Sequence, residues 1–227
     1  CDTNTGISFA LHSEEKEYQN EIKFLLNKLF NVTMVDYIRD RHRYDGRVSH
    51  KLLVKLFSSL CGYNAYNKKI PNWALYLPND KLWPMVESMF KGDGCIDYDA
   101  GTLRYSTVSK LLATQLQFVL LHLGVVSSVR DSKNRCEYTV TVYRPEIYKV
   151  PFVSGIKQVN KTQSQFIKVD GGWLFPVREN KKVFYDGTVY NLEVPEEHSY
   201  LMAGGVVHNC MPVLESMSCG IPVIATN

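Results

Sequence analysis

The sequence predicts an α+β protein in which a strand–helix–hairpin unit occurs twice and is followed by a β-rich region. Apolar residues recur at helical spacing in residues 14–30, 52–60, 81–92 and 110–123, and they alternate at period two in the hairpins between these helices. The element order of residues 1–61 returns about 95 residues later. Such internal similarity indicates two related units that pack as one pseudo-symmetric body.

Composition limits the class of protein. The 227 residues are 45% hydrophobic with a formal net charge of +3, as in a globular protein, so any nucleic-acid surface has to come from local clustering of charge. The longest apolar run, residues 118–126, is too short to span a bilayer, and we expect no membrane partner. Six cysteines form no CxxC pair, which argues against a zinc site or a disulfide framework and predicts a cytoplasmic location.

The first unit, residues 1–61, is predicted to run strand, helix, hairpin, helix. Residues 7–11 alternate weakly, and Ser13 is the candidate N-cap of a helix over 14–30 with acidic residues in its first turn. Residues 32–50 alternate at period two, with a tight turn predicted at Asp45-Gly46. Ser49 is expected to cap the next helix, and Gly62 to end it.

The second unit contains a helix that the first unit lacks. Residues 95–105, 110–123 and 126–143 correspond to residues 1–11, 14–30 and 32–50. They are preceded by an apolar helix over 81–92, with Asp80 as its cap and Pro84 in its first turn. Because no counterpart precedes the first unit, we expect the chain to open midway through a repeat.

The nine residues from Val86 to Gly94, VESMFKGDG, resemble the signature helix of LAGLIDADG homing endonucleases, and the surrounding repeat is similar to that family's pattern. The resemblance implies a truncated, pseudo-symmetric αββαββα-type endonuclease domain over residues 1–153, lacking its first signature helix. It implies that Asp93 is a catalytic acid that holds Mg²⁺ at the DNA. It also implies a catalytic lysine in the segment Lys68-Lys69-Ile70-Pro71, where Lys69 is favoured over Lys68.

Two departures from that family affect the expected activity. Only one of the two expected acids is present, and Lys91 occupies a position that is often acidic. We therefore expect that this chain does not cleave double-stranded DNA. A glycine-rich turn after a helix is also common as a simple C-cap, so the motif alone does not establish a metal site.

Cationic side chains gather in the two predicted hairpins. Arginines and lysines along such strands can follow a phosphate backbone, and with the endonuclease resemblance they imply double-stranded DNA as a partner. The alternative is a solvated strand face, because exposed arginines are common. The candidate DNA-binding residues are Arg39, Arg41, Arg43, Arg130, Lys133 and Arg135.

Residues 154–209 change in character. Residues 157–165 are polar, and short strands are predicted over 173–177, 182–185, 189–194 and 200–203, separated by Gly and Asp turns. The series TVYNLEV at 188–194, HSYL at 198–201 and VVHNC at 206–210 resembles the C-terminal splicing blocks of inteins. The resemblance implies the β-rich C-terminal half of a Hint (Hedgehog/intein) splicing domain, whose N-terminal segment would be a missing partner.

The last of these blocks can break its own backbone. The amide nitrogen of Asn209 can attack the Asn209 carbonyl carbon and sever the bond to Cys210, and His208 can polarise the carbonyl or move the proton near pH 7. The resemblance implies that His198 assists, that Cys210 accepts the acyl group, and that splicing needs no cofactor. Asn191 stands where inteins often carry aspartate, so we expect a variant or slower path.

Residues 210–227 read as a short helix and a buried strand. They resemble the donor-binding segment of retaining glycosyltransferases, with Glu215 as one of two glutamates that face the sugar nucleotide, which implies a host glycosyltransferase extein. Two alternatives stay open. A stand-alone LAGLIDADG endonuclease or DNA-binding module predicts that Asn209→Ala leaves processing unchanged. A glycosyltransferase with an insertion predicts binding of a nucleotide sugar.

Overall fold

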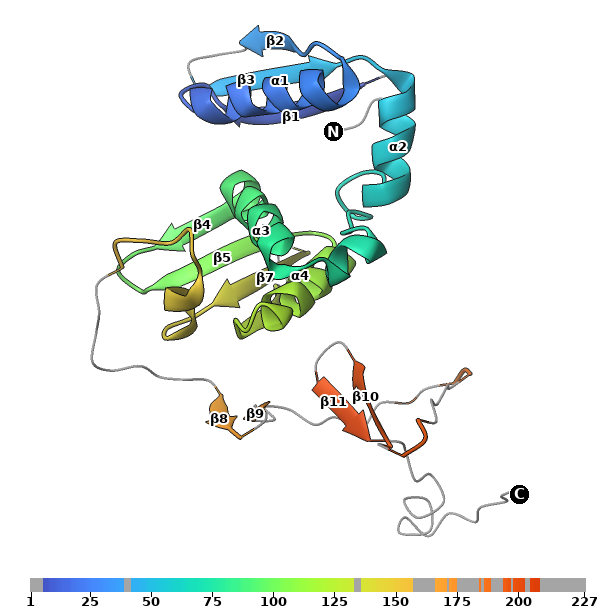
Figure 1. Ribbon diagram of the computed structural model, residues 1–227, viewed down its shortest axis with the longest axis vertical. Coiled ribbons are helices and arrows are strands. Elements are labelled where there is room, and N and C mark those ends of the chain that lie inside the picture. Colours follow the sequence, from blue (N-terminus) through green and yellow to red (C-terminus); the bar gives the residue numbers. More distant parts are fainter. Residues whose placement is uncertain are drawn as a thin grey trace. The chain divides into compact units, whose positions relative to one another are not determined.

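The computed structural model describes residues 6–38, 42–132, 136–156, 166–170, 172–174, 184, 186–188, 194–196, 198–202 and 205–208 (Figure 1). The chain forms two compact units, residues 1–167 and 168–227. Within the described residues, no helix is both long enough and apolar enough to cross a membrane. The domain boundaries predicted at residues 153 and 209 stay predictions.

The first half of unit 1 is a three-stranded antiparallel sheet with two helices. Its central strand, β3, pairs with β1 on one side and β2 on the other. The small core consists of Leu26, Met34, Tyr44, Val48 and Leu53. The elements are β1 (Ile7–His12), α1 (Lys16–Phe30), β2 (Val35–Ile38), β3 (Arg43–Val48) and α2 (Lys51–Cys61).

The predicted turn at Asp45-Gly46 is wrong, because both residues lie inside β3, where Asp45 faces Ala10 of β1 and Tyr37 of β2. A side chain on Gly46 would overlap the side chain of buried Met34. The glycine therefore permits close packing rather than a turn.

The two predicted caps in this half are also wrong. The Nδ1 atom of His50, rather than Ser49, accepts a hydrogen bond from the Leu53 amide at 3.3 Å and caps α2. The first helix begins at Lys16, and its N-terminus has no side-chain cap from Ser13. Gly62 ends α2 with a positive φ of 84°, as predicted.

The second half of unit 1 is a four-stranded antiparallel sheet in the order β4-β5-β7-β6. Two helices, α3 and α4, cover the same face of this sheet and share with it one core. The elements are η1 (Asn72–Tyr76), α3 (Asn79–Asp93), β4 (Gly94–Asp97), β5 (Thr102–Thr107), α4 (Lys110–His122), β6 (Ser127–Ser132), β7 (Glu137–Val142) and η2 (Glu146–Lys149).

The predicted repeat is confirmed. The strand order β1-β3-β2 reproduces β5-β7-β6, and the helices α1 and α4 follow the corresponding strands β1 and β5. The predicted helices over 81–92 and 110–123 are present, and the side chain of Ser109 caps α4. Since α3 begins at Asn79, Asp80 lies in its first turn and does not cap it.

Unit 2 contains two described hairpins: β8 (Ile167–Val169) pairs with β9 (Gly172–Leu174), and β10 (Ser199–Met202) pairs with β11 (Gly205–His208). The strands predicted over 173–177 and 200–203 overlap β9 and β10. Most of the residues predicted as strands over 182–185 and 189–194, and all of the tail 210–227, lie outside the described residues.

Candidate functional site

A carboxylate, an ammonium group and a phenol meet at the end of α3. Asp93 is the last residue of that helix, and its Oδ2 lies 3.9 Å from Lys68 Nζ. The hydroxyl of Tyr105, on β5, donates to the same oxygen at 3.5 Å. The Asp93 side chain is 57% exposed, so it remains open to a ligand while two neighbours hold it. The predicted acid thus has partners that residue spacing did not reveal.

The position of Asp93 follows from the packing of α3. Leu82, Val86 and Phe90 recur every four residues and are buried against the core of the second half. The helix ends at Asp93 and β4 begins at Gly94, where a Cβ would overlap the Phe90 carbonyl, so this close approach requires a glycine. The buried stripe and the small residue together present the carboxylate at the edge of β4.

Side chains of α4 hold the segment that carries Lys68. Ser109 Oγ donates to the Lys68 carbonyl at 2.6 Å. The Gln115 amide accepts from the Ile70 N–H at 2.7 Å and donates to the Ile70 carbonyl at 2.9 Å. Since Gln115 and Ile70 are both buried, these bonds fix the backbone of the segment against α4.

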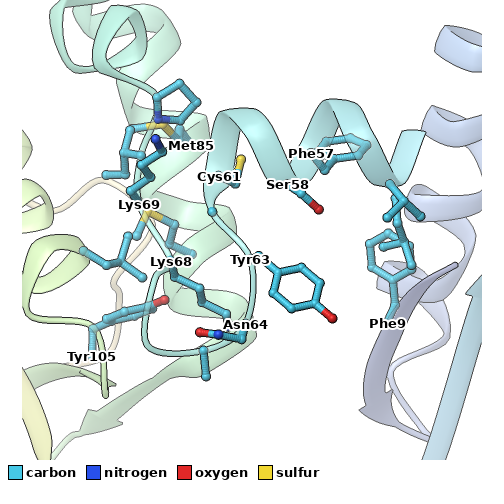
Figure 2. Close-up of a pocket in the computed structure, with 18 residues that line it drawn as sticks. Phe9, Phe57, Ser58, Cys61, Tyr63, Asn64, Lys68, Lys69, Met85 and Tyr105 are labelled. Atoms are coloured by element: carbon cyan, nitrogen blue, oxygen red, sulfur yellow. The ribbon is translucent and has the colours of Figure 1, made fainter. Parts of the chain in front are cut away.

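The lysine beside Asp93 is Lys68, whereas the sequence favoured Lys69. The Lys69 amide donates to the Cys61 carbonyl at 2.9 Å, which ties the backbone of the segment to the end of α2. Both lysines line a largely apolar cavity of about 760 Å³, where Figure 2 shows them on the same wall as Tyr105, across from Phe9. Lys68 is therefore the lysine that lies near Asp93, and the choice of Lys69 as the catalytic lysine stays a prediction.

Burial raises the pKa of Tyr105, and the negative charge of Asp93 raises it further. The phenol is therefore neutral at physiological pH and can act only as a donor toward the carboxylate. Tyr105 escaped the sequence prediction because it looked like an ordinary inward-facing residue of an alternating strand.

A polar surface extends from Asp93 across the sheet face that the helices leave uncovered. Ser106 Oγ donates to Glu137 Oε1 at 3.2 Å and lies 3.3 Å from Thr139 Oγ1, and Arg104 Nη2 lies 3.5 Å from Asp97 Oδ2. These side chains line a depression of about 550 Å³. We call this surface the polar sheet face: Cys95, Asp97, Thr102, Arg104, Ser106, Arg130, Ser132, Glu137, Thr139 and Thr141.

Two of the six predicted DNA-binding residues are described. Arg130 lies on the polar sheet face, and Arg43 is an exposed residue of β3 whose Nε lies 3.2 Å from Asp45 Oδ1. The other four, Arg39, Arg41, Lys133 and Arg135, lie outside the described residues. Arg104 was missed, although the alternation of Thr102, Arg104 and Ser106 in β5 was a readable signal.

The residues predicted for backbone cleavage lie in unit 2. The β10–β11 register places Ser199 opposite His208, and His198 directly precedes β10 with a positive φ of 48°. The His198 amide donates to the Val194 carbonyl at 3.2 Å. Asn209 and Cys210 lie outside the described residues. The hairpin thus brings the backbone that carries His198 to the strand end from which residue 209 follows.

Comparison with protein families matches residues 85–150 to the LAGLIDADG-like domain. This stretch begins within α3 and ends just after η2, so it contains Asp93 and all four strands of the polar sheet face.

Three curated proteins are similar over nearly the whole chain. An uncharacterised protein of Methanocaldococcus jannaschii is 28% identical over 91% of this chain and 25% of its own length. The ATP-dependent DNA helicase Hel308 of Thermococcus kodakarensis is 30% identical over 91% of this chain and 20% of its own. An iron–sulfur cluster assembly SufBD family protein of Mycobacterium bovis is 28% identical over 99% of this chain and 27% of its own. The chain therefore spans about a quarter of the length of these relatives.

Solved structures identify the fold. A mesophilic variant of the homing endonuclease I-DmoI superimposes with a TM-score of 0.51 at 18% identity, covering 64% of this chain and 76% of that one. I-DmoI in complex with its target DNA in the presence of magnesium gives 0.50 at 17% identity, covering 63% and 76%. Residues 85–150 thus resemble the LAGLIDADG-like domain, and about two thirds of the chain shares the mixed α/β fold of the homing endonuclease I-DmoI.

Proposed function

We propose that residues 1–153 bind double-stranded DNA on the polar sheet face and bring Asp93 to a scissile phosphate. The observation that carries this proposal is the continuity of that face with the cluster of Asp93, Lys68 and Tyr105. A two-stranded β-ribbon fits a major groove, and phosphate contacts would come from the cationic residues predicted in the hairpins. The fold similarity to I-DmoI, whose structure was solved in complex with its target DNA, also supports DNA binding.

Asp93 fits a magnesium ion that keeps most of its water. The described residues contain no group of three or more His, Cys, Asp or Glu placed to hold a metal ion, and Asp93 is the carboxylate that we propose as its ligand. Mg²⁺ is commonly held by one or two carboxylates together with substrate phosphates. When bound, the cation would stabilise charge that develops on the phosphate oxygens. Lys68 would add a positive charge there, and Tyr105 would orient the carboxylate.

Duplex binding is the direct test. Fluorescence anisotropy with a labelled random-sequence duplex should give binding that weakens steeply as salt rises from 50 to 200 mM, because phosphate contacts release counterions. Lys110→Ala is the control, since Lys110 is an exposed cation on α4, on the opposite side of the sheet. The proposal would be contradicted if the chain did not bind the duplex at 50 mM salt, or if Lys110→Ala weakened the binding. With Mg²⁺ added, we expect the duplex to stay uncut, since only one acid is available.

We propose, as a second function, that residues 154–209 are the C-terminal part of an intein splicing domain. Two observations favour it. The β10–β11 register draws His198 toward the end of the strand that precedes Asn209. The region similar to this chain also recurs in a helicase and in an iron–sulfur assembly protein, and it occupies 20% and 27% of their lengths. Recurrence in proteins with different activities is what a self-removing insertion would produce.

The proposed cleavage consumes one peptide bond and forms another C–N bond. The side-chain nitrogen of Asn209 attacks the Asn209 carbonyl carbon and closes a succinimide, while the bond from that carbon to the Cys210 nitrogen breaks. The proton lost by the attacking amide passes to the departing amine, and His208 and His198 are the groups that would carry it. In a complete precursor, the Cys210 thiol would first accept the upstream acyl group.

Mass spectrometry of the purified chain tests the splicing proposal. We expect slow release of residues 210–227, the proposed glycosyltransferase extein, faster when an N-terminal splicing segment is supplied. Asn209→Ala should abolish release, and an intact wild-type mass after long incubation with that segment would contradict the proposal. If Asn209→Ala changes nothing, the chain is a DNA-binding module without splicing chemistry.

A further inference from the structure

We propose that Arg104 and Arg130 read two guanines that lie about three to four base pairs apart in the major groove. This inference rests on the DNA binding proposed above and adds the sequence that the site would prefer. It assigns Arg104 a role that the sequence did not predict, and it gives Arg130 a base contact in place of a phosphate contact.

The charge balance of the polar sheet face favours base contacts over phosphate contacts. Among the residues that line the depression, Arg104 and Arg130 carry positive charge, whereas Asp93, Asp97 and Glu137 carry negative charge. A surface that only followed phosphates would be strongly basic, because each contact neutralises one negative charge. Hydroxyl groups of Ser106 and Thr139 lie between the charged groups. Such a mixture of donors and acceptors suits base edges, which offer both.

The strand register fixes the relation between the two arginines. Arg130 on β6 faces Thr139 on β7, which faces Ser106 on β5, and Arg104 lies two residues before Ser106 on the same strand. All four side chains therefore share one face of the sheet. The arginines are two strands apart and offset by one two-residue step.

That relation converts into a spacing along DNA. Neighbouring strands are about 4.8 Å apart and two residues advance about 6.8 Å, so the two arginine positions are roughly 12 Å apart. Successive base pairs rise about 3.4 Å, which makes the separation about three to four base pairs.

The Arg104 guanidinium is already oriented. Its Nη2 lies 3.5 Å from Asp97 Oδ2, and the side chain is still 47% exposed and lines the depression, so it remains accessible to a ligand. A guanidinium presents two parallel donors that match O6 and N7 of guanine. Asp97 would hold the fork in the required direction and reduce the entropy lost on binding.

Selection from a random duplex library with the full chain is the test. The wild-type chain should enrich duplexes that carry two guanines about three to four base pairs apart. Arg104→Ala should lose the preference at one guanine and Arg130→Ala at the other, with an affinity loss of about tenfold or more for the selected site. Both variants should weaken binding to random duplex less than binding to the selected site, and Lys110→Ala should leave both affinities unchanged.

The outcomes separate this inference from the proposed function. If the arginine variants weaken binding equally on all sequences, both residues contact phosphates. This result would refute the guanine contacts and leave the proposed DNA binding supported. If no duplex binds, both proposals fail.

A second readout uses Cys95, which is exposed and faces Arg104 across the β4–β5 pair. Bound target should protect Cys95 from alkylation, measured by peptide mass. Full reactivity of Cys95 in the complex would place the DNA elsewhere and overturn the assignment.

Discussion

Gln115→Met should destabilise unit 1 far more than an ordinary glutamine substitution. The Gln115 amide satisfies both the N–H and the carbonyl of Ile70, at 2.7 and 2.9 Å, and the two residues are only 7% and 4% exposed. Methionine preserves the length of the side chain but leaves two buried backbone groups without partners. Each costs about 1–3 kcal/mol, so after partial relaxation we expect a total loss of about 2–4 kcal/mol.

Urea denaturation and thermal unfolding measure this loss. For a chain of this length, the melting temperature should fall by about 2–4 °C per kcal/mol. Gln117→Met is the matched control, because Gln117 lies on the same helix and makes a single bond, to the Ser127 carbonyl at 3.1 Å, from a part-buried position. Gln117→Met should lower the free energy of unfolding by about 1 kcal/mol. Equal losses in the two variants would refute the role assigned to the paired bonds with Ile70.

Three further predictions concern packing and titration. Gly46→Ala should cost about 1–3 kcal/mol in urea denaturation, because the new methyl group overlaps a buried methionine; unchanged stability would show that the core can shift. Burial raises the pKa of Cys61, so at pH 8 it should alkylate more slowly than exposed Cys95, and equal rates in the folded chain would contradict its burial. A hydrogen bond from Lys23 is the largest of the causes that lower the pKa of Asp36. The ionised Asp36 carboxylate therefore stabilises the folded chain fully above the unfolded pKa of about 3.9, and this stabilisation is lost as pH falls through the lower folded pKa. Asp36→Asn should therefore lose less stability than the wild-type chain between pH 5 and pH 2, and parallel losses would argue against the linkage.

The helices and the repeat were predictable because both rest on residue spacing. The helix predicted over 81–92 from its apolar spacing is confirmed, and Leu82, Val86 and Phe90 are its buried residues. The strand order of the two halves follows from the repeat of strand, helix and hairpin. In these parts of the chain, local periodicity and tertiary packing favour the same secondary structure.

The turn prediction failed where packing overrode a local preference. Asp45-Gly46 has the composition of a tight turn, but the glycine lies inside β3, where the side chain of Met34 leaves no room for a Cβ. The true connection between β2 and β3 comes earlier, between residues 38 and 43. A single sequence does not say which neighbour will approach a glycine.

The sequence suggested the acid of the candidate cluster but not the residues near it. Asp93 was proposed from the signature helix, whereas the backbone position of Lys68 depends on hydrogen bonds from the side chains of Ser109 and Gln115, more than 40 residues away. Tyr105 depended on the pairing of β4 with β5, which brings the strand back to the helix end. Contacts between residues so far apart in the sequence cannot be predicted from the spacing of residues alone.

The alternation of β5 distinguishes mutations that affect the core from mutations that affect the exposed surface. Leu103 and Tyr105 face the core, whereas Thr102, Arg104 and Ser106 face outward. Substitution of an outward residue removes little buried area, so it alters recognition at small thermodynamic expense. Under the proposed function, new target sequences could be explored one outward position at a time, while every intermediate along that lineage continues to fold.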